Sequence, residues 1–272
     1  MSIERRTTVA TKIAIMAITA VLYAVAKALT SFIPTPFGVG QLLIGIFVPA
    51  FMAVVADTFS VAVGAGLGTF IGDAVFLTPQ GSTNPALSLI AGVPANFVAF
   101  LLFGWFVKRY KSWPAFVAAT VSFVTLGNLI AATSIVLFGA SVFTALGPLT
   151  RAYSLTSLVL GFTVFWTATM IPAILVAVPI LVRAVKPLEG RSPIISYYPS
   201  WSLVSARTQA VTSAFFAVLL LVLGVLYFVV APSSLAAVFP GLEDFLVVAV
   251  ASLILLGPVV GVIAGSKSKP AT

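Results

Sequence analysis

The sequence predicts an all-α, polytopic helical membrane protein. Of its 272 residues, 61% are hydrophobic and only 7% are charged, whereas soluble domains carry about 25% charged residues. Apolar runs of about 18 or more residues recur along the chain, and each is long enough to cross the roughly 30 Å hydrocarbon core of a bilayer. The runs are continuous rather than alternating, which excludes a membrane β-barrel.

Eight apolar spans are expected in chain order. They are Val9–Phe32, Gln41–Ala56, Phe59–Leu77, Ala86–Val107, Trp113–Phe138, Ser154–Val182, Thr208–Val230 and Phe245–Ala264. The first six are closely spaced, so residues 1–185 are expected to form a six-helix membrane core. Residues 186–207 form a cytoplasmic linker whose Tyr197, Tyr198 and Trp201 suit the headgroup level. Residues 208–272 form an appended transmembrane hairpin of two further helices.

The basic residues predict the orientation in the membrane. With the N-terminus inside, cytoplasmic segments collect all but two of the 14 Lys and Arg residues, and only Lys27 and Arg151 remain for the outer half. Positive charge on the cytoplasmic side predicts a multi-pass protein of the plasma membrane with both termini cytoplasmic. The net charge of +8 therefore reflects the bilayer as a partner, and no nucleic-acid partner is expected. The first apolar stretch runs on to Phe32, longer than a signal-peptide h-region, so cleavage is not expected.

Missing residue types narrow the chemistry. The chain contains no Cys and no His, which removes disulfides, haem ligation, zinc sites and histidine acid–base mechanisms. Asp57 and Asp73 are separated by about 24 Å along a helix, so they cannot form an aspartyl-protease dyad, and Asp57 is expected to be a solvated cap or turn residue. No zincin, Walker A or Ser–His pattern is present. We therefore expect neither an enzyme nor a bound cofactor or metal.

Small residues predict close helix packing in two spans. Gly64, Gly68 and Gly72 lie one turn apart in the third span. Alanines recur at similar spacing within the first span, among them Ala10, Ala14, Ala20 and Ala24. Small side chains at this spacing let helix backbones approach closely in lipid. They serve either packing within the chain or docking of a partner subunit.

A few polar residues at membrane depth mark a candidate binding site. They are Lys27, Asp73, Gln80, Asn84, Asn96, Asn128 and Arg151. By the expected topology Asn96 and Asn128 lie about mid-span and the others toward the outer side, and together they would converge on an outward-facing cavity. A charge inside an apolar segment is costly without a partner. Each residue also has a structural interpretation: Asp73 pairs with Lys27 or caps a backbone, Lys27 snorkels, Asn96 and Asn128 bond between helices, and Arg151 is a plain loop residue.

Several short motifs occur in a familiar order over about the first 185 residues. They are Lys12–Ala17, Gly38–Gln41, Pro49–Phe51, Gly72-Asp73, Gly92–Phe97 and Gly104-Trp105. Their order and spacing resemble the substrate-binding S components of energy-coupling factor (ECF) transporters. The two helices after residue 207 exceed the six-helix pattern of that family.

The resemblance implies a six-helix core that binds a vitamin-like small molecule between outer helix ends and loops. A membrane T component and two ATPase subunits would be the partners that drive uptake. In that family an Ala-x-x-x-Ala pair on the first helix meets the T component. Here Ala14 matches and Ile18 stands at the second alanine, with Ala10–Ala14 and Ala20–Ala24 as substitutes. Members that carry nickel or cobalt use an N-terminal histidine, which is missing here, so an organic substrate is expected.

Two other functions stay open. A stand-alone secondary transporter would show inverted repeats around a midplane site, and no corresponding halves are visible. A structural membrane protein would use the small-residue faces without needing Lys27, Asp73 or Asn96. The substrate stays open too, because Lys27 and Arg151 favour an anionic group whereas Asp73 favours a cationic or hydrogen-bond-donating one.

Overall fold

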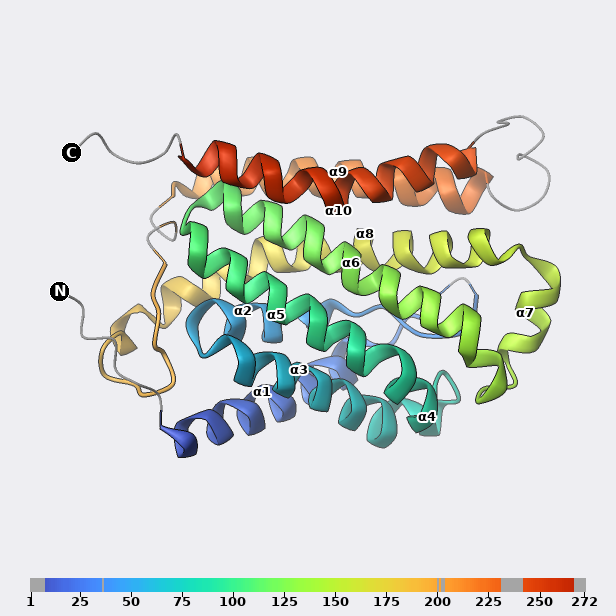
Figure 1. The fold of residues 1–272 in the computed structure, drawn as a ribbon, viewed down its shortest axis with the longest axis horizontal. Helices are drawn as coiled ribbons and strands as arrows, with labels where there is room; N and C mark the ends of the chain where they lie inside the picture. Colours follow the sequence, from blue (N-terminus) through green and yellow to red (C-terminus); the bar gives the residue numbers. More distant parts are fainter. Residues whose placement is uncertain (1–7, 36, 200, 202–203, 231–241, 267–272) are drawn as a thin grey trace.

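The computed structural model describes residues 8–35, 37–199, 201, 204–230 and 242–266, which are helical apart from connecting segments (Figure 1). In chain order the elements are α1 (Val9–Thr30), η1 (Ile44–Ile46), α2 (Phe47–Val55), α3 (Thr58–Ile71), η2 (Gly72–Leu77), η3 (Thr78–Gln80), α4 (Pro85–Leu87), η4 (Ser88–Gly92), α5 (Val93–Tyr110), α6 (Trp113–Phe138), η5 (Gly139–Ser141), α7 (Leu146–Ala152), α8 (Leu155–Ala184), η6 (Lys186–Leu188), α9 (Ala206–Val230) and α10 (Leu242–Ser266). Within the described residues, six helices with their continuations are long and apolar enough to cross a membrane. The predicted class, a polytopic helical membrane protein, is confirmed at this level.

Side-chain caps fix where several spans begin. Thr8, Ser112 and Ser154 accept a hydrogen bond from the backbone of the first turns of α1, α6 and α8. Asp57 caps α3, with its Oδ2 atom accepting from Ser60 N at 2.9 Å and Ser60 Oγ at 2.6 Å, as predicted for a cap residue. Partial burial alone would raise the pKa of Asp57, but the Ser60 hydrogen bonds and the charges of Lys12 and Lys108 outweigh it and lower that pKa.

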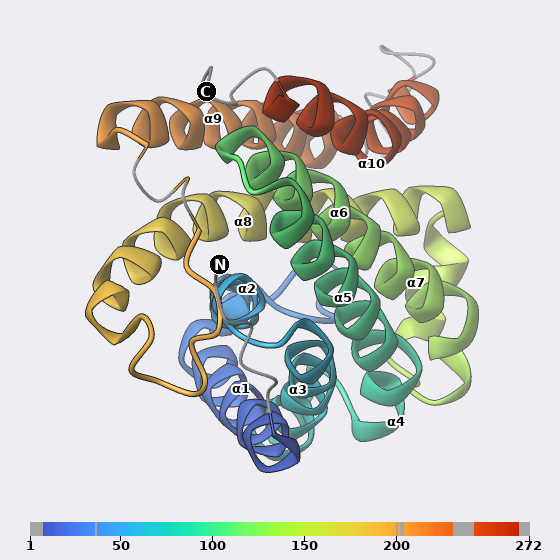
Figure 2. The same cartoon turned by 60° about the vertical axis from the view of Figure 1, so that its left-hand side comes forward.

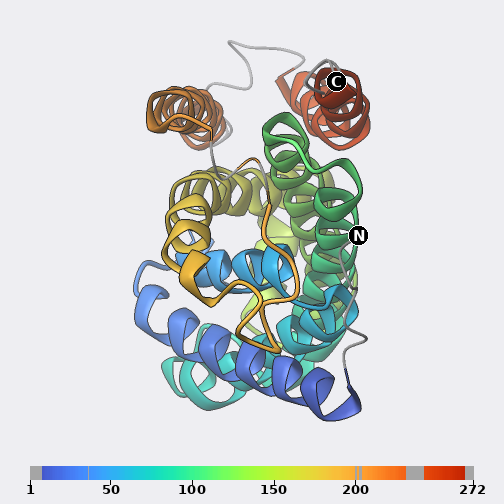
Figure 3. The same cartoon turned by 90° about the vertical axis from the view of Figure 1, so that its left-hand side faces the viewer.

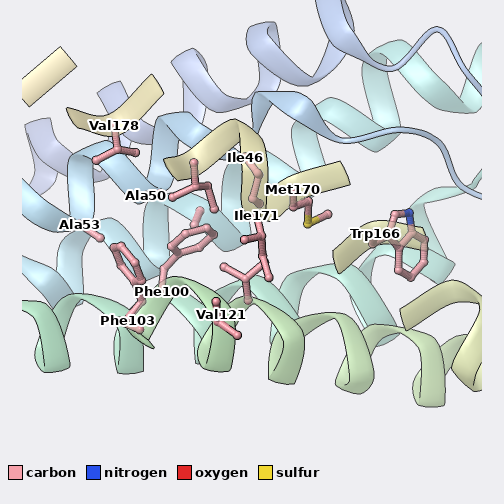
Figure 4. Close-up of a cluster of buried hydrophobic side chains, with 14 of the residues drawn as sticks. Ile46, Ala50, Ala53, Phe100, Phe103, Val121, Trp166, Met170, Ile171 and Val178 are labelled. Carbon is pink, nitrogen blue, oxygen red and sulfur yellow. The ribbon is translucent and has the colours of Figure 1, made fainter. Parts of the chain in front are cut away.

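The short helix α2 lies at the centre of the bundle. Seen at an angle to the helix axes, it is surrounded by α1, α3, α5, α6 and α8 (Figure 2). Its buried side chains pack against α5 and α8 (Figure 4), with Ala50 and Ala53 fully buried. Ile44–Val55 spans about 18 Å at 1.5 Å per residue. The prediction that Gln41–Ala56 forms a membrane-spanning helix is therefore wrong. The helix within it is a core helix that is too short to cross the bilayer by itself.

The last two helices lie on the outside of this bundle. α9 packs mainly on α8, and α10 packs on α6, so the two stand apart above the core (Figure 3). A Cβ atom at Gly261 would come within 2.5 Å of Ala118 Cβ, and Ser122 Oγ donates to Leu253 O at 2.8 Å. Each helix thus packs on a different helix of the core, and the predicted division into core and appended hairpin stays a prediction.

The segment between α8 and α9 crosses one end of the bundle. The backbone N–H groups of Ser196 and Tyr197 donate to Val55 O at 2.9 and 3.1 Å, and so complete the C-terminus of α2. Trp201 is 3% exposed and stacks on Phe116, with ring centroids 4.4 Å apart. Burial raises the pKa of Tyr197 to about 12. Trp201 thus packs into the core of the protein, and its predicted position at headgroup level stays a prediction.

The beginning of α1 and the end of α10 lie at the same end of the molecule (Figure 1). Most described basic residues belong to helix ends and connections there, namely Lys12, Lys108, Arg109, Lys111, Arg183, Lys186, Arg191 and Arg207. We refer to this as the basic end. Its assignment to the cytoplasm stays a prediction.

Candidate functional site

A cavity of about 90 Å³ lies inside the bundle, toward the end opposite the basic end. Its walls come from α1, α3, α5, α6 and α8, from the short helices η1, η2, α4 and η4, and from the segments around residues 39–43 and 82–83. Four of the seven predicted site residues line it: Lys27, Asp73, Asn96 and Asn128. The expected convergence of polar residues is thus seen for these four.

An ion pair forms one wall of the cavity. Lys27 Nζ lies 2.5 Å from Asp73 Oδ1, and the two side chains are 5% and 8% exposed. The other carboxylate oxygen of Asp73 accepts a hydrogen bond from Ser88 Oγ at 2.7 Å. The pairing of Asp73 with Lys27 that the sequence offered as the structural interpretation is therefore present, and it lies within the cavity wall.

Two π-helical segments place these groups. Asp73 lies in η2, and Ser88 begins η4, so both helices that flank the carboxylate widen at this point. Thr78 Oγ1 donates to Asp73 O at 2.8 Å and satisfies one carbonyl of the widened turn. Short π-helical turns occur frequently at functional sites. Because both π-helical segments meet at the ion pair, this wall is the part of the cavity that we single out as functional.

Glycines in α3 and at the start of η2 bring α1 close enough to form the pair. A Cβ atom at Gly68 would lie 2.7 Å from Ala20 O, and one at Gly72 would lie 3.0 Å from Lys27 Cδ. Close packing of this face, predicted from its small residues, is thus a contact within the chain.

The same contact occupies two of the predicted docking residues. Ala20 and Ala24 are 3% and 1% exposed, buried on the α3 side of α1. Ala10 is exposed and Ala14 is half-buried. In this structure only Ala10 and Ala14 of the four keep an accessible side.

A loop covers the cavity where α1 leads into η1. We call its described residues, 34–35 and 37–41, the covering loop. Pro34 and Gln41 form an isolated antiparallel bridge, and Gly40 N donates to Ser82 O at 3.1 Å. Gly40 has φ +73°, and a Cβ atom there would lie 2.8 Å from Trp166. Glycine is therefore required, by backbone conformation and by contact.

Gln41 closes the covering loop over the cavity. Its backbone oxygen accepts from Trp166 Nε1 at 3.1 Å, and its Nε2 donates to Gln80 Oε1 at 3.1 Å. Gln41 is 7% exposed, and its Oε1 atom is buried without a hydrogen-bond partner. A buried acceptor of this kind is costly unless a ligand or water satisfies it.

The other predicted residues take different positions. Asn96 Nδ2 donates to Gly92 O within its own helix at 2.9 Å, and Asn128 Nδ2 donates to Thr167 Oγ1 at 3.1 Å, joining α6 to α8. Asn84 caps α4 and also donates to Val142 O. Gln80 is exposed and reaches the cavity only through Gln41. Arg151 is exposed on α7, and neither it nor Gln80 nor Asn84 lines the cavity.

Sequence reasoning missed several lining residues. Gln41 stands at the polar start of the expected second span, and Ser82 and Ser88 flank Asn84. These polar positions at span borders were available as a signal. Trp166 lies inside a continuous apolar run and carries no such signal.

The arrangement is suited to binding. Within the described residues, no cluster of three or more metal-ligating side chains occurs. The cavity instead combines one buried ion pair, the amides of Gln41, Asn96 and Asn128, several hydroxyls and apolar walls. Comparison with protein-family models, with curated proteins and with solved structures finds no match to this chain.

Proposed function

We propose that this chain is the substrate-binding S component of an ECF-type importer, which captures a vitamin-like organic micronutrient from outside the cell. The observation that carries the proposal is the cavity beneath the covering loop, with its buried Lys27–Asp73 pair and the unsatisfied Gln41 acceptor. Uptake would be driven by a T component and two ATPase subunits. The six-helix core plus two appended helices is part of the same proposal.

The arrangement of the outer helices agrees with a partner on the α1 side. α9 and α10 cover α8 and α6, on the side of the bundle away from α1 (Figure 3). α1 keeps exposed apolar side chains such as Ile13, Val21 and Leu29. A T component is proposed to dock here, near Ala10 and Ala14, with the basic end in the cytoplasm.

The size of the cavity implies that the covering loop moves. About 90 Å³ is well below the roughly 300–1,000 Å³ of typical small-molecule sites. The contacts that hold the loop closed include the Gly40–Ser82 and Trp166–Gln41 hydrogen bonds and the packing of Phe37 on Phe162. Their release would enlarge the cavity for a vitamin-sized molecule.

The proposal is tested by native mass spectrometry of the purified protein, which should show a retained small molecule. Asn96→Ala removes a lining amide that bonds only within its own helix, so it should weaken binding about 3- to 10-fold, the worth of one hydrogen bond, with little loss of stability. Arg151→Ala, outside the cavity, is the matched control and should bind normally.

Other outcomes favour the alternatives. Uptake by the purified chain alone in vesicles, without ATPases or a T component, would support a secondary transporter. Failure to retain any molecule, together with no change in melting temperature across a vitamin panel, would leave a structural membrane protein.

A further inference from the structure

The charges that line the cavity cancel each other. Among the described lining residues, Lys27 and Asp73 are the only charged ones, and they are paired at 2.5 Å. Ser88 Oγ donates to the second carboxylate oxygen, so each oxygen of Asp73 already has one partner, and the charge of the carboxylate is balanced by Lys27. Arg151, which favoured an anionic substrate at the level of sequence, lies outside the cavity.

Among the described lining residues, Gln41 supplies a fully buried side-chain atom that has no hydrogen-bond partner, and it is neutral. Gln41 Oε1 is a buried acceptor without a partner, on a side chain that is 93% buried and lines the cavity. A ligand that donates an N–H or O–H at this position would satisfy it. The neighbouring walls, from Trp166, Met170, Phe100 and Val124, are apolar.

We infer that the ligand is a compact, uncharged organic molecule that carries a hydrogen-bond donor, which it presents to Gln41 Oε1. A net charge would enter a water-poor site whose own charges are already paired, and it would find no counter-ion there. This inference rests on the proposed function, and it names the class of substrate.

A matched set of probes separates the charge states. Nicotinamide, nicotinate and 1-methylnicotinamide share one ring and nearly one size, and they are neutral, anionic and cationic at neutral pH. Thermal shift and calorimetry on the full chain in detergent should show nicotinamide binding about tenfold or more tighter than either charged analogue. Equal or tighter binding of a charged analogue, or no binding of any of the three, overturns the inference.

Two variants test the named groups. Gln41→Leu removes the acceptor and should lower nicotinamide affinity about tenfold, whereas Gln80→Ala, which removes only the exposed partner of Gln41 Nε2, should leave it nearly unchanged. Asp73→Asn leaves the charge of Lys27 unbalanced, so the preference should move from nicotinamide to nicotinate. An unchanged affinity in Gln41→Leu contradicts the inference even if Asp73→Asn fails to fold.

The retained molecule distinguishes this inference from the proposed function. An uncharged donor-bearing molecule in the native mass spectrum supports both. A charged or zwitterionic molecule that Asn96→Ala releases would uphold the proposed function and overturn the inference about substrate class.

Discussion

At the scale of single residues, the buried pair of Lys27 and Asp73 has the largest energetic consequence. Both side chains are less than one-tenth exposed, so each has lost most of its hydration. Such a pair adds little net stability relative to apolar residues of similar volume, but removal of one partner leaves a buried charge unpaired and typically costs about 3–5 kcal/mol. The intact pair therefore adds little to the free energy of unfolding, but neither partner can be removed alone without a large loss of stability.

We expect Asp73→Ala to lower the free energy of unfolding by about 3–5 kcal/mol, because it leaves the ammonium group of Lys27 unpaired. The double variant Lys27→Met/Asp73→Leu removes both charges and should recover most of that loss. Thermal unfolding in detergent measures both. Additive losses in the double variant would show that the two charges do not stabilise one another.

Individual site residues differ in how far the sequence predicts them. Lys27 and Asp73 were predictable because a charge in an apolar segment is conspicuous, and Asn96 and Asn128 for a similar reason. Gln41 and Ser88 were not predicted, because their role depends on a covering loop and two π-helical turns that hydropathy does not encode. Arg151 was predicted only from its charge, and its helix α7 lies away from the cavity.

At the scale of helices, the contact between α1 and α3 sets the position of Lys27. The contact depends on Gly64 and Gly68, where an added Cβ atom would lie 2.7 Å from backbone oxygens of α1. Backbone atoms cannot move aside as a flexible side chain does, so even alanine would push the helices apart.

Gly68→Ala should therefore destabilise the protein by about 1–3 kcal/mol, the usual cost of overpacking. It should also weaken ligand binding, since α1 carries Lys27. Gly66→Ala is the control on the same helix, because its Cβ atom would come no closer than 3.4 Å to any of its neighbours, Val93 and Phe97. The melting temperatures of the two variants measure the difference. Equal losses in Gly68→Ala and Gly66→Ala would refute a special role for the contact between α1 and α3.

Helix ends were predicted best where the sequence provides a cap. The predicted span Trp113–Phe138 coincides with α6, which Ser112 caps. The second span was misjudged because a core helix surrounded by other helices is as apolar as one that faces lipid. Length separates the two cases, since 12 residues fall short of a bilayer.

At the scale of the whole molecule, the basic end makes a prediction about orientation. The chain contains no cysteine, so single cysteines report without interference. Thr144→Cys lies at the end opposite the basic end, and Glu189→Cys lies beside Lys186; both native residues are exposed.

A membrane-impermeant maleimide should label Thr144→Cys on intact cells and Glu189→Cys only after permeabilisation, because positively charged ends remain in the cytoplasm. The reverse pattern would invert the topology and with it the outward-facing cavity. The charge pattern thus predicts which end is which, but not that α9 and α10 bind α8 and α6 separately, since that depends on the fit of Gly261 against Ala118.

The shortness of α2 also bears on how the protein is inserted into the membrane during synthesis. A helix of about 18 Å cannot anchor itself across the bilayer, and the non-helical residues before it carry backbone groups that lipid cannot satisfy. Those groups find partners on elements synthesised later, such as Ser82 and Trp166, and the end of α2 is completed by Ser196 and Tyr197. The centre of the bundle thus cannot complete its hydrogen bonds before the chain has been made to about residue 200.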